Sequence, residues 1–181
     1  MKKVEHGKTF DRNAANPPAF EIFHNTVTEG YPEHWHTAIE IIMPTRGEYE
    51  VVVGKDSYNL KEGDIIMINS GVVHGMRFVS QGERIVMLVE PGCVENQEEM
   101  ETIFLRLPAI YFKKEDEEDP FYLFLRSQIL ELVREYDNEG AVMTHRICTG
   151  LKELFSEFGR KGKIGRAHVC TTVTFRSRMP T

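Results

Sequence analysis

Two segments decide the fold of this chain, GYPEHWHTAIE (residues 30–40) and GDIIMINSGVVH (residues 63–74). Between them they supply three imidazoles and one carboxylate, from His34, His36, Glu40 and His74. Imidazole and carboxylate groups are metal ligands, and neutral imidazole suits zinc, copper, iron and nickel. These four residues are therefore the candidate metal ligands of the chain.

The spacing of the first segment also predicts its shape. Side chains alternate faces along a strand, so His34, His36 and Glu40 share one parity. Four extended residues nevertheless span roughly 13 Å, which is too far for His36 and Glu40 to share one ion with bonds of about 2 Å. We therefore expect a bend or bulge at residues 37–39. His74 would reach the same point from another strand of an antiparallel barrel.

The two segments follow recognisable patterns. Residues 30–47 read G-x3-H-x-H-x3-E-x6-G, and residues 63–78 read G-x5-N-x-G-x2-H-x3-F. They resemble the two sequence motifs of the cupin barrel, although the first lacks two residues of the usual gap before its first histidine. The second has Asn69 where proline is usual and Phe78 where asparagine is usual. These departures fall on turn and packing positions and leave all four ligand positions filled.

The resemblance implies a mainly β fold: a cupin-type antiparallel β-barrel, or double-stranded β-helix, followed here by a C-terminal α-helical hairpin. It also implies one divalent transition metal (Zn, Ni, Fe or Mn) on His34, His36, Glu40 and His74. In sensor barrels of this kind the same side chains can instead line a cavity for an organic effector. Tyr31 and Trp35 are added as candidate ligand-binding residues near the barrel mouth, with core packing as the alternative for Trp35.

Changes of pattern along the chain predict its organisation. We expect an N-terminal arm at 1–19, the barrel at 20–92, a linker at 93–118 and a helical hairpin at 119–160. Asp119 is a candidate N-cap with proline at the next position, Gly63 is expected to take a positive φ, and the second helix should end at Gly159. Apolar residues recur at helical spacing in both predicted helices: Phe121, Phe124, Leu125, Ile129, Leu132 and Val133, then Ile147, Leu151, Leu154, Phe155 and Phe158.

The last segment, residues 161–181, resembles the translation of a sequencing adapter and is expected to be non-native. Residues 160–181 contain six of the 22 Lys and Arg and none of the 28 Asp and Glu. The acidic remainder is a poor polyanion binder, because phosphate contacts need Lys and Arg. We therefore expect that the barrel does not itself bind DNA.

Composition narrows the class of protein further. With 41% hydrophobic and 28% charged residues among 181, the chain reads as a globular domain with an appendage. It has no apolar run long enough for a membrane span and no signal-peptide core, so a cytoplasmic location is expected. Cys93, Cys148 and Cys170 share no close spacing, and free thiols are the default prediction.

A cupin barrel followed by a helical hairpin resembles the effector-binding and dimerisation half of AraC-type transcription regulators. The resemblance implies a small-molecule effector such as a sugar, a homodimer, and DNA binding only through a helix-turn-helix domain that is missing here. Effector binding would reorder the arm or the hairpin. The main alternative is a metal-dependent cupin enzyme, a dioxygenase or isomerase using the three-histidine, one-glutamate site. A free-standing storage or binding cupin is the third reading.

Overall fold

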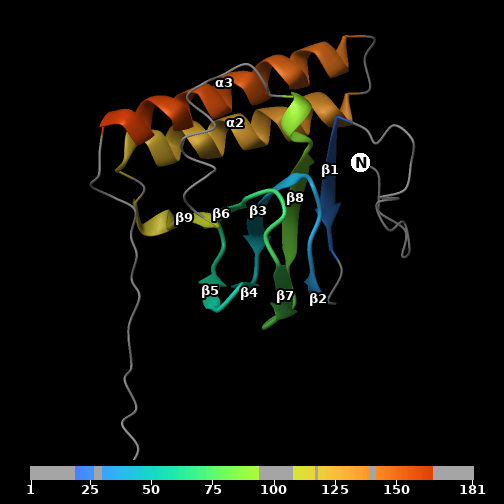
Figure 1. Ribbon diagram of the computed structural model, residues 1–181, viewed down its shortest axis with the longest axis vertical. Coiled ribbons are helices and arrows are strands. Elements are labelled where there is room, and N and C mark those ends of the chain that lie inside the picture. Colours follow the sequence, from blue (N-terminus) through green and yellow to red (C-terminus); the bar gives the residue numbers. More distant parts are fainter. Residues whose placement is uncertain (1–18, 27–29, 94–107, 117, 139–141, 165–181) are drawn as a thin grey trace, which may run out of the picture.

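The computed structural model describes residues 19–26, 30–93, 108–116, 118–138 and 142–164. These residues form a mainly β body with two helices at its C-terminal end (Figure 1). The strands are β1 (Phe20–Asn25), β2 (Tyr31–His34), β3 (Ile39–Arg46), β4 (Tyr49–Val53), β5 (Asp56–Leu60), β6 (Ile65–Ile68), β7 (His74–Phe78), β8 (Glu83–Val89) and β9 (Ala109–Phe112). The helices are η1 (Pro91–Cys93), η2 (Lys114–Asp116), α2 (Pro120–Asp137) and α3 (Met143–Ile164).

The strands form two antiparallel sheets. The larger sheet has the order β1-β8-β3-β6-β9, and the smaller has the order β2-β7-β4-β5. An apolar cluster lines the inner faces of the two sheets and includes Ile42, Val51, Leu60, Ile66 and Met76. Gly63 has a φ of 86°, as predicted for the turn before β6.

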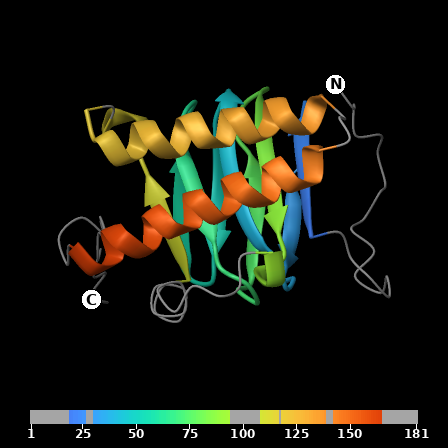
Figure 2. The same cartoon turned by 90° about the horizontal axis from the view of Figure 1, so that it is seen from above.

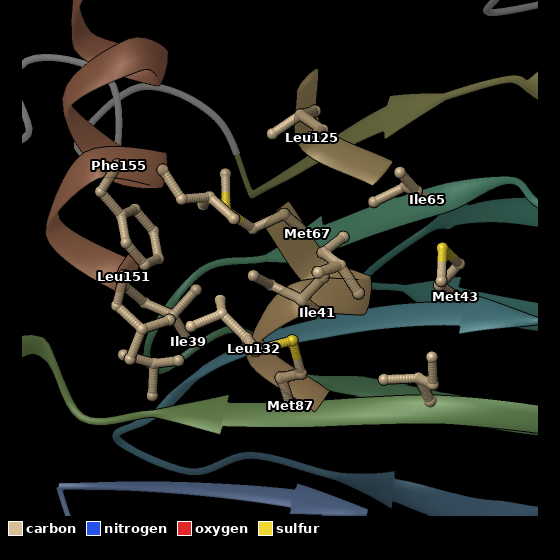
Figure 3. Close-up of a cluster of buried hydrophobic side chains, with 14 of the residues drawn as sticks. Ile39, Ile41, Met43, Ile65, Met67, Met87, Leu125, Leu132, Leu151 and Phe155 are labelled. Atoms are coloured by element: carbon tan, nitrogen blue, oxygen red, sulfur yellow. The ribbon is translucent and has the colours of Figure 1, made fainter. Parts of the chain in front are cut away.

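Strand β3 is buried on both faces from Ile39 to Pro44, which explains why all of these residues except Glu40 are apolar. Alternate residues point in opposite directions along a strand, so Glu40 and Ile42 lie on the inner face of the sheet. Ile39, Ile41 and Met43 lie on the outer face, in a second apolar cluster shared with the helices (Figure 3). Strand β3 thus separates the barrel interior, on its inner face, from the layer of helices α2 and α3 on its outer face.

Helices α2 and α3 lie side by side across the outer face of the larger sheet (Figures 1 and 2). The Asp119 side chain accepts a hydrogen bond from the Phe121 amide at 2.9 Å, which confirms the predicted N-cap. Both helices pack on the sheet through fully buried side chains, which include Leu125 of α2 and Leu151 and Phe155 of α3. Helix α3 continues to Ile164 and does not end at Gly159, because one glycine costs a helix only about 1 kcal/mol.

The expected linker at 93–118 contains a strand, which corrects that prediction. Strand β9 extends the larger sheet by pairing with β6 through Ile66↔Tyr111 and Ile68↔Ala109. Its four residues are all half-buried, so they show no alternation from which a strand could be predicted. Residues 94–107 of that range lie outside the described residues.

A cluster of hydrogen bonds joins the turn Lys61–Asp64 to the segment that leads into α2. The buried Asp64 carboxylate accepts hydrogen bonds from the Tyr111 hydroxyl at 2.6 Å and from the Lys114 amide at 2.8 Å. It also accepts one from the Lys61 amide at 2.9 Å. The buried Tyr122 hydroxyl donates to the Gly63 carbonyl at 2.9 Å. We call this cluster the Asp64 joint; it holds β9 and the start of α2 on the barrel.

Most of the predicted arm and tail lies outside the described residues. Only Ala19, at the end of the predicted arm, and residues 161–164, at the end of α3, are described. Among the helices that are described, none combines the length and the apolar character that a membrane crossing requires.

Candidate functional site

The four predicted ligand residues come together inside the barrel. Each of His34, His36, Glu40 and His74 offers one donor atom, and these atoms lie within 4.8 Å of one another. His34 ends β2, His74 begins β7, and the two are paired across the smaller sheet. Glu40 belongs to β3 of the larger sheet, and His36 lies in the connection between them. The group therefore links the two sheets at one end of the barrel.

The chain bends between His36 and Glu40, as their spacing requires. Residues 37 and 38 form the bend that separates His36 from the start of β3. The Gly71 amide donates to the His36 carbonyl at 2.8 Å, which fixes the backbone at this bend from the opposite turn. The bend brings the His36 Nε2 atom to 2.9 Å from Glu40 Oε2, a contact that a straight strand could not make.

Backbone carbonyls orient all three imidazoles in the same way. The Nδ1 atoms of His34, His36 and His74 lie 2.9, 2.9 and 2.8 Å from the carbonyl oxygens of Pro32, Ala38 and Val72. A carbonyl oxygen only accepts hydrogen bonds, so each Nδ1 must carry a proton. In a neutral imidazole the Nε2 lone pair then remains available. Metal-binding histidines are commonly oriented by such a second hydrogen bond.

The Glu40 carboxylate lies between two of these imidazoles. Its Oε2 atom is 2.9 Å from Nε2 of His36 and 2.9 Å from Nε2 of His74, and Glu40 is only 6% exposed. Burial by itself disfavours the charged carboxylate, but the Nε2 contacts of His36 and His74, which are hydrogen bonds when these rings carry a second proton, outweigh it and lower the pKa of Glu40 to about 2. The carboxylate is therefore an anion throughout the physiological range.

These contacts fit a divalent cation. With both Nδ1 atoms protonated, neutral His36 and His74 would turn their Nε2 lone pairs toward the lone pairs of an anionic carboxylate. That arrangement is repulsive unless extra protons make imidazolium ions or a cation lies among the donor atoms. Three Nε2 atoms and one carboxylate oxygen form a donor set typical of zinc, nickel, iron or manganese.

His34 lies on the open side of the group. It is half-buried, whereas the other three residues are buried, and its burial is the main cause that lowers its pKa. Its ring centroid lies 4.5 Å from that of His74 and 6.5 Å from that of Tyr31. A molecule from solvent would therefore meet His34 first.

The two aromatic residues predicted at the mouth are both at the surface. Tyr31 is 43% exposed, and Trp35 is 57% exposed. The Tyr31 hydroxyl accepts a hydrogen bond from the Asn25 amide group at 3.0 Å. Both tyrosine and tryptophan therefore remain candidates for ligand contact.

The sequence analysis missed the buried Arg84, on β8. Its guanidinium lies 4.9 Å from the Tyr49 ring centroid and 5.3 Å from that of Tyr31, in cation–π geometry. Arg84 is fully buried, so it adds a positive charge to the inside of the barrel beside the predicted mouth. Its only sequence signal is one basic residue at the start of an apolar strand, which is indistinguishable from a solvated strand end.

Comparisons with known proteins agree with this architecture. Residues 25–90 match the model of the Cupin domain family. No curated protein matches the chain. The structure is similar to that of an apo ToxT variant from Vibrio cholerae, with a TM-score of 0.51 and 13% identity over 82% of this chain and 57% of that chain.

Two further solved structures match the barrel region less extensively. One is the conserved SPY1581 protein of unknown function from Streptococcus pyogenes, with 18% identity, a TM-score of 0.36, and coverage of 40% of this chain and 63% of that one. The other is a variant of oxalate decarboxylase from Bacillus subtilis, with 18% identity, a TM-score of 0.37, and coverage of 40% and 21%. The chain thus spans less than two thirds of each of these proteins. The fold is of the cupin type: mainly β, with two antiparallel sheets and two C-terminal helices.

Proposed function

We propose that this chain is the small-molecule-sensing part of a transcription regulator that resembles the AraC type. One observation carries the proposal: strand β3, which carries Glu40 on its inner face, also carries Ile39 and Ile41 on its outer face, where they pack against the helix layer formed by α2 and α3. A ligand that displaces Glu40 must therefore act on residues that pack on α2 and α3. The similarity to ToxT supports this proposal at the level of fold alone. It covers 82% of this chain, which is more than the barrel by itself.

The sensing mechanism is a shift between two populations. A ligand enters beside His34, Trp35 and Tyr31 and makes polar contacts with the histidine–glutamate group. The ligand changes the position of the helix layer only if it binds with unequal affinity to the two arrangements of the helices on the barrel. A sugar is the example that the resemblance implies, with hydroxyl groups that match these donors and acceptors. DNA would be bound by a further helix-turn-helix domain, and the helix layer would mediate a homodimer.

A metal ion is compatible with this function. His34, His36, Glu40 and His74 would hold it, and it would supply a Lewis acid that polarises a ligand oxygen. The backbone-bound Nδ1–H groups would keep the three imidazoles oriented in either case. In a sensor, the same group of residues would orient the effector without consuming it.

The second candidate function is a metal-dependent cupin enzyme, a dioxygenase or an isomerase. The observation in its favour is the donor set itself, because its half-exposed His34 side leaves access for a substrate. An enzyme of this kind requires no response from the helices. The two functions therefore differ in what α2 and α3 do when a ligand binds.

The experiment uses the single tryptophan as a reporter. After treatment with EDTA, the protein is titrated with Ni²⁺ or Zn²⁺ while Trp35 fluorescence is recorded, in the wild type and in His36→Ala. We expect saturable binding with one metal per chain in the wild type and its loss in the variant. His145→Ala is the matched control, because His145 is exposed on α3, away from the four residues.

The same preparation is then screened by thermal denaturation against pentoses and hexoses. A sensor is expected to show a sugar that raises the Tm, is recovered unchanged, and alters hydrogen exchange in α2 and α3. Conversion of the sugar to an isomer, or uptake of dioxygen, would replace the sensor by the enzyme. A Tm shift without any change in helix exchange would also contradict the sensing proposal.

A further inference from the structure

Two cysteines that are far apart in sequence lie in contact behind the larger sheet. The Sγ atoms of Cys93, in η1, and Cys148, in α3, are 3.3 Å apart and are free thiols. Both side chains are half-buried and pack against the apolar cluster shared by the sheet and the helices. Cys148 thus places the first half of α3 directly against the segment that follows β8.

We propose that Cys93 and Cys148 are a modification site at which a hydroperoxide forms an intramolecular disulfide. A disulfide bond is about 2.05 Å long, so the two sulfur atoms need to approach by only about 1.3 Å. Because η1 and α3 are separate elements, a small rotation of either side chain can supply part of that approach. This inference is independent of the histidine–glutamate group and of the proposed sensing function.

The position of the pair determines what the bond would do. It would close the chain from Cys93 to Cys148 into a covalent ring that contains β9 and α2. Helix α3 would then be fastened to the end of β8 by a covalent bond in addition to apolar packing. Opening of the helix layer away from the sheet would be restricted at the N-terminal half of α3.

The reaction balances with hydrogen peroxide or an organic hydroperoxide as the only oxidant. A thiolate attacks the peroxide, forming an S–O bond and breaking the O–O bond; its sulfur loses two electrons, and the leaving oxygen takes a proton to become water or an alcohol. The second thiol attacks this sulfenic acid, so that the S–S bond forms, the S–O bond breaks and water leaves. Two thiols therefore give one disulfide and two molecules of water with hydrogen peroxide, or one disulfide, one alcohol and one water with an organic hydroperoxide.

The environment of Cys93 affects the reactivity of its thiol. Burial and the neighbouring Cys148 thiol raise the pKa of Cys93 to about 12, although Lys152 opposes the shift. Cys93 is therefore a neutral thiol near pH 7 and a poor first nucleophile.

The test is made in a Cys170→Ser background, which leaves Cys93 and Cys148 as the two remaining cysteines. The protein is treated with hydrogen peroxide, alkylated, digested without reduction and mapped by mass spectrometry. We expect a linked peptide pair that contains Cys93 and Cys148 and is two hydrogen atoms lighter than the two thiol peptides. Closing a ring of this size is also expected to raise the Tm by roughly 10 °C, reversibly on reduction.

Two single variants in the same background complete the test. Cys93→Ser and Cys148→Ser are each expected to accumulate a sulfenic acid that dimedone traps, because the thiol that would close the disulfide is absent. Circular dichroism establishes that both variants are folded. Exclusive formation of intermolecular disulfides or of sulfinic acid in the two-cysteine protein would overturn the proposal, as would a linked pair that leaves the Tm unchanged.

Discussion

Replacing Asp64 by alanine is expected to weaken the attachment of the helix layer to the barrel more than any other single change in the turn before β6. The Asp64 carboxylate is 4% exposed and accepts three hydrogen bonds, two of them from residues of the segment that leads into α2. Alanine removes all three acceptor contacts.

The magnitude follows from the three contacts. A hydrogen bond to a charged group contributes about 1.5–3 kcal/mol, and the amides of the exposed Lys61 and Lys114 would regain water in the variant. Taking the low end for each of the three contacts gives about 4.5 kcal/mol, and the water that binds the two amides reduces this to a loss of about 3–4 kcal/mol in the free energy of unfolding. For a chain of this length, that corresponds to a fall in Tm of roughly 10 °C.

Tyr111→Phe tests the contact between Asp64 and β9 without changing any residue of the turn Lys61–Asp64. It removes the 2.6 Å contact between the Tyr111 hydroxyl and Asp64, together with the longer 3.2 Å contact of the same hydroxyl with the Asn59 carbonyl, so we expect a loss of about 1.5 kcal/mol. In the double variant the two effects are not additive, because both changes remove the same hydrogen bond. The coupling energy should be about 1–2 kcal/mol.

Urea denaturation followed by far-ultraviolet circular dichroism and by Trp35 fluorescence gives these free energies. Asp56→Ala is the control, since Asp56 is an exposed aspartate on β5 and its replacement should cost less than about 0.5 kcal/mol. If Asp64→Ala is within 1 kcal/mol of this control, the carboxylate does not hold the joint and the reasoning fails.

Three further predictions address the site, the helix surface and the shared core. In metal-free protein, the folded pKa of Glu40 is about 2, below its ordinary 4.5, so the stability that the ionised carboxylate contributes is present above pH 4.5 and is lost as the pH falls toward 2. Between pH 5 and pH 3, the free energy of unfolding measured with urea should therefore fall by about 2 kcal/mol more in the wild type than in Glu40→Gln. Equal losses in the two proteins would contradict the lowered pKa. The exposed Leu123 and Leu130 lie two turns apart on α2. For the proposed homodimer, their joint replacement by glutamate should leave only monomer in sedimentation velocity, whereas Val79→Glu, at an exposed apolar residue outside the helices, should leave the dimer intact. Leu151→Ala should cost about 2–5 kcal/mol and lower the circular dichroism and Trp35 transitions together, whereas separate transitions would show that barrel and helices are independent.

Structural features that depend on residues close together in sequence could be predicted well. The resemblance of two short motifs to those of cupin barrels indicated the four-residue group, and the spacing of His36 and Glu40 required the bend that residues 37 and 38 form. Asp119 followed by proline located the start of α2, and Gly63 has the positive φ expected of its turn. In each case the signal is local: a periodicity, a cap or a backbone conformation that few residues adopt.

The features that were missed depend on long-range contacts. Cys93 and Cys148 are 55 residues apart, and no spacing rule connects them. Asp64 was read only as part of a turn, because its partners Tyr111 and Lys114 come from a segment that was predicted to be a linker. Arg84 is buried by two tyrosines from other strands. Pairing between distant segments leaves no trace in local composition, so sequence patterns could not supply it.

In the proposed sensor, the division of the ligand group between the two sheets constrains what an effector would have to touch. His34 and His74 belong to the smaller sheet, which has no strand in the cluster shared with the helices. Glu40 is carried by β3, whose neighbours Ile39 and Ile41 pack in that cluster. A molecule that rests only on the exposed Tyr31 and the smaller sheet can therefore bind without moving α2 and α3. A molecule that draws Glu40 toward or away from His36 and His74 changes the separation of the two sheets, and the helices must follow the sheet on which they pack.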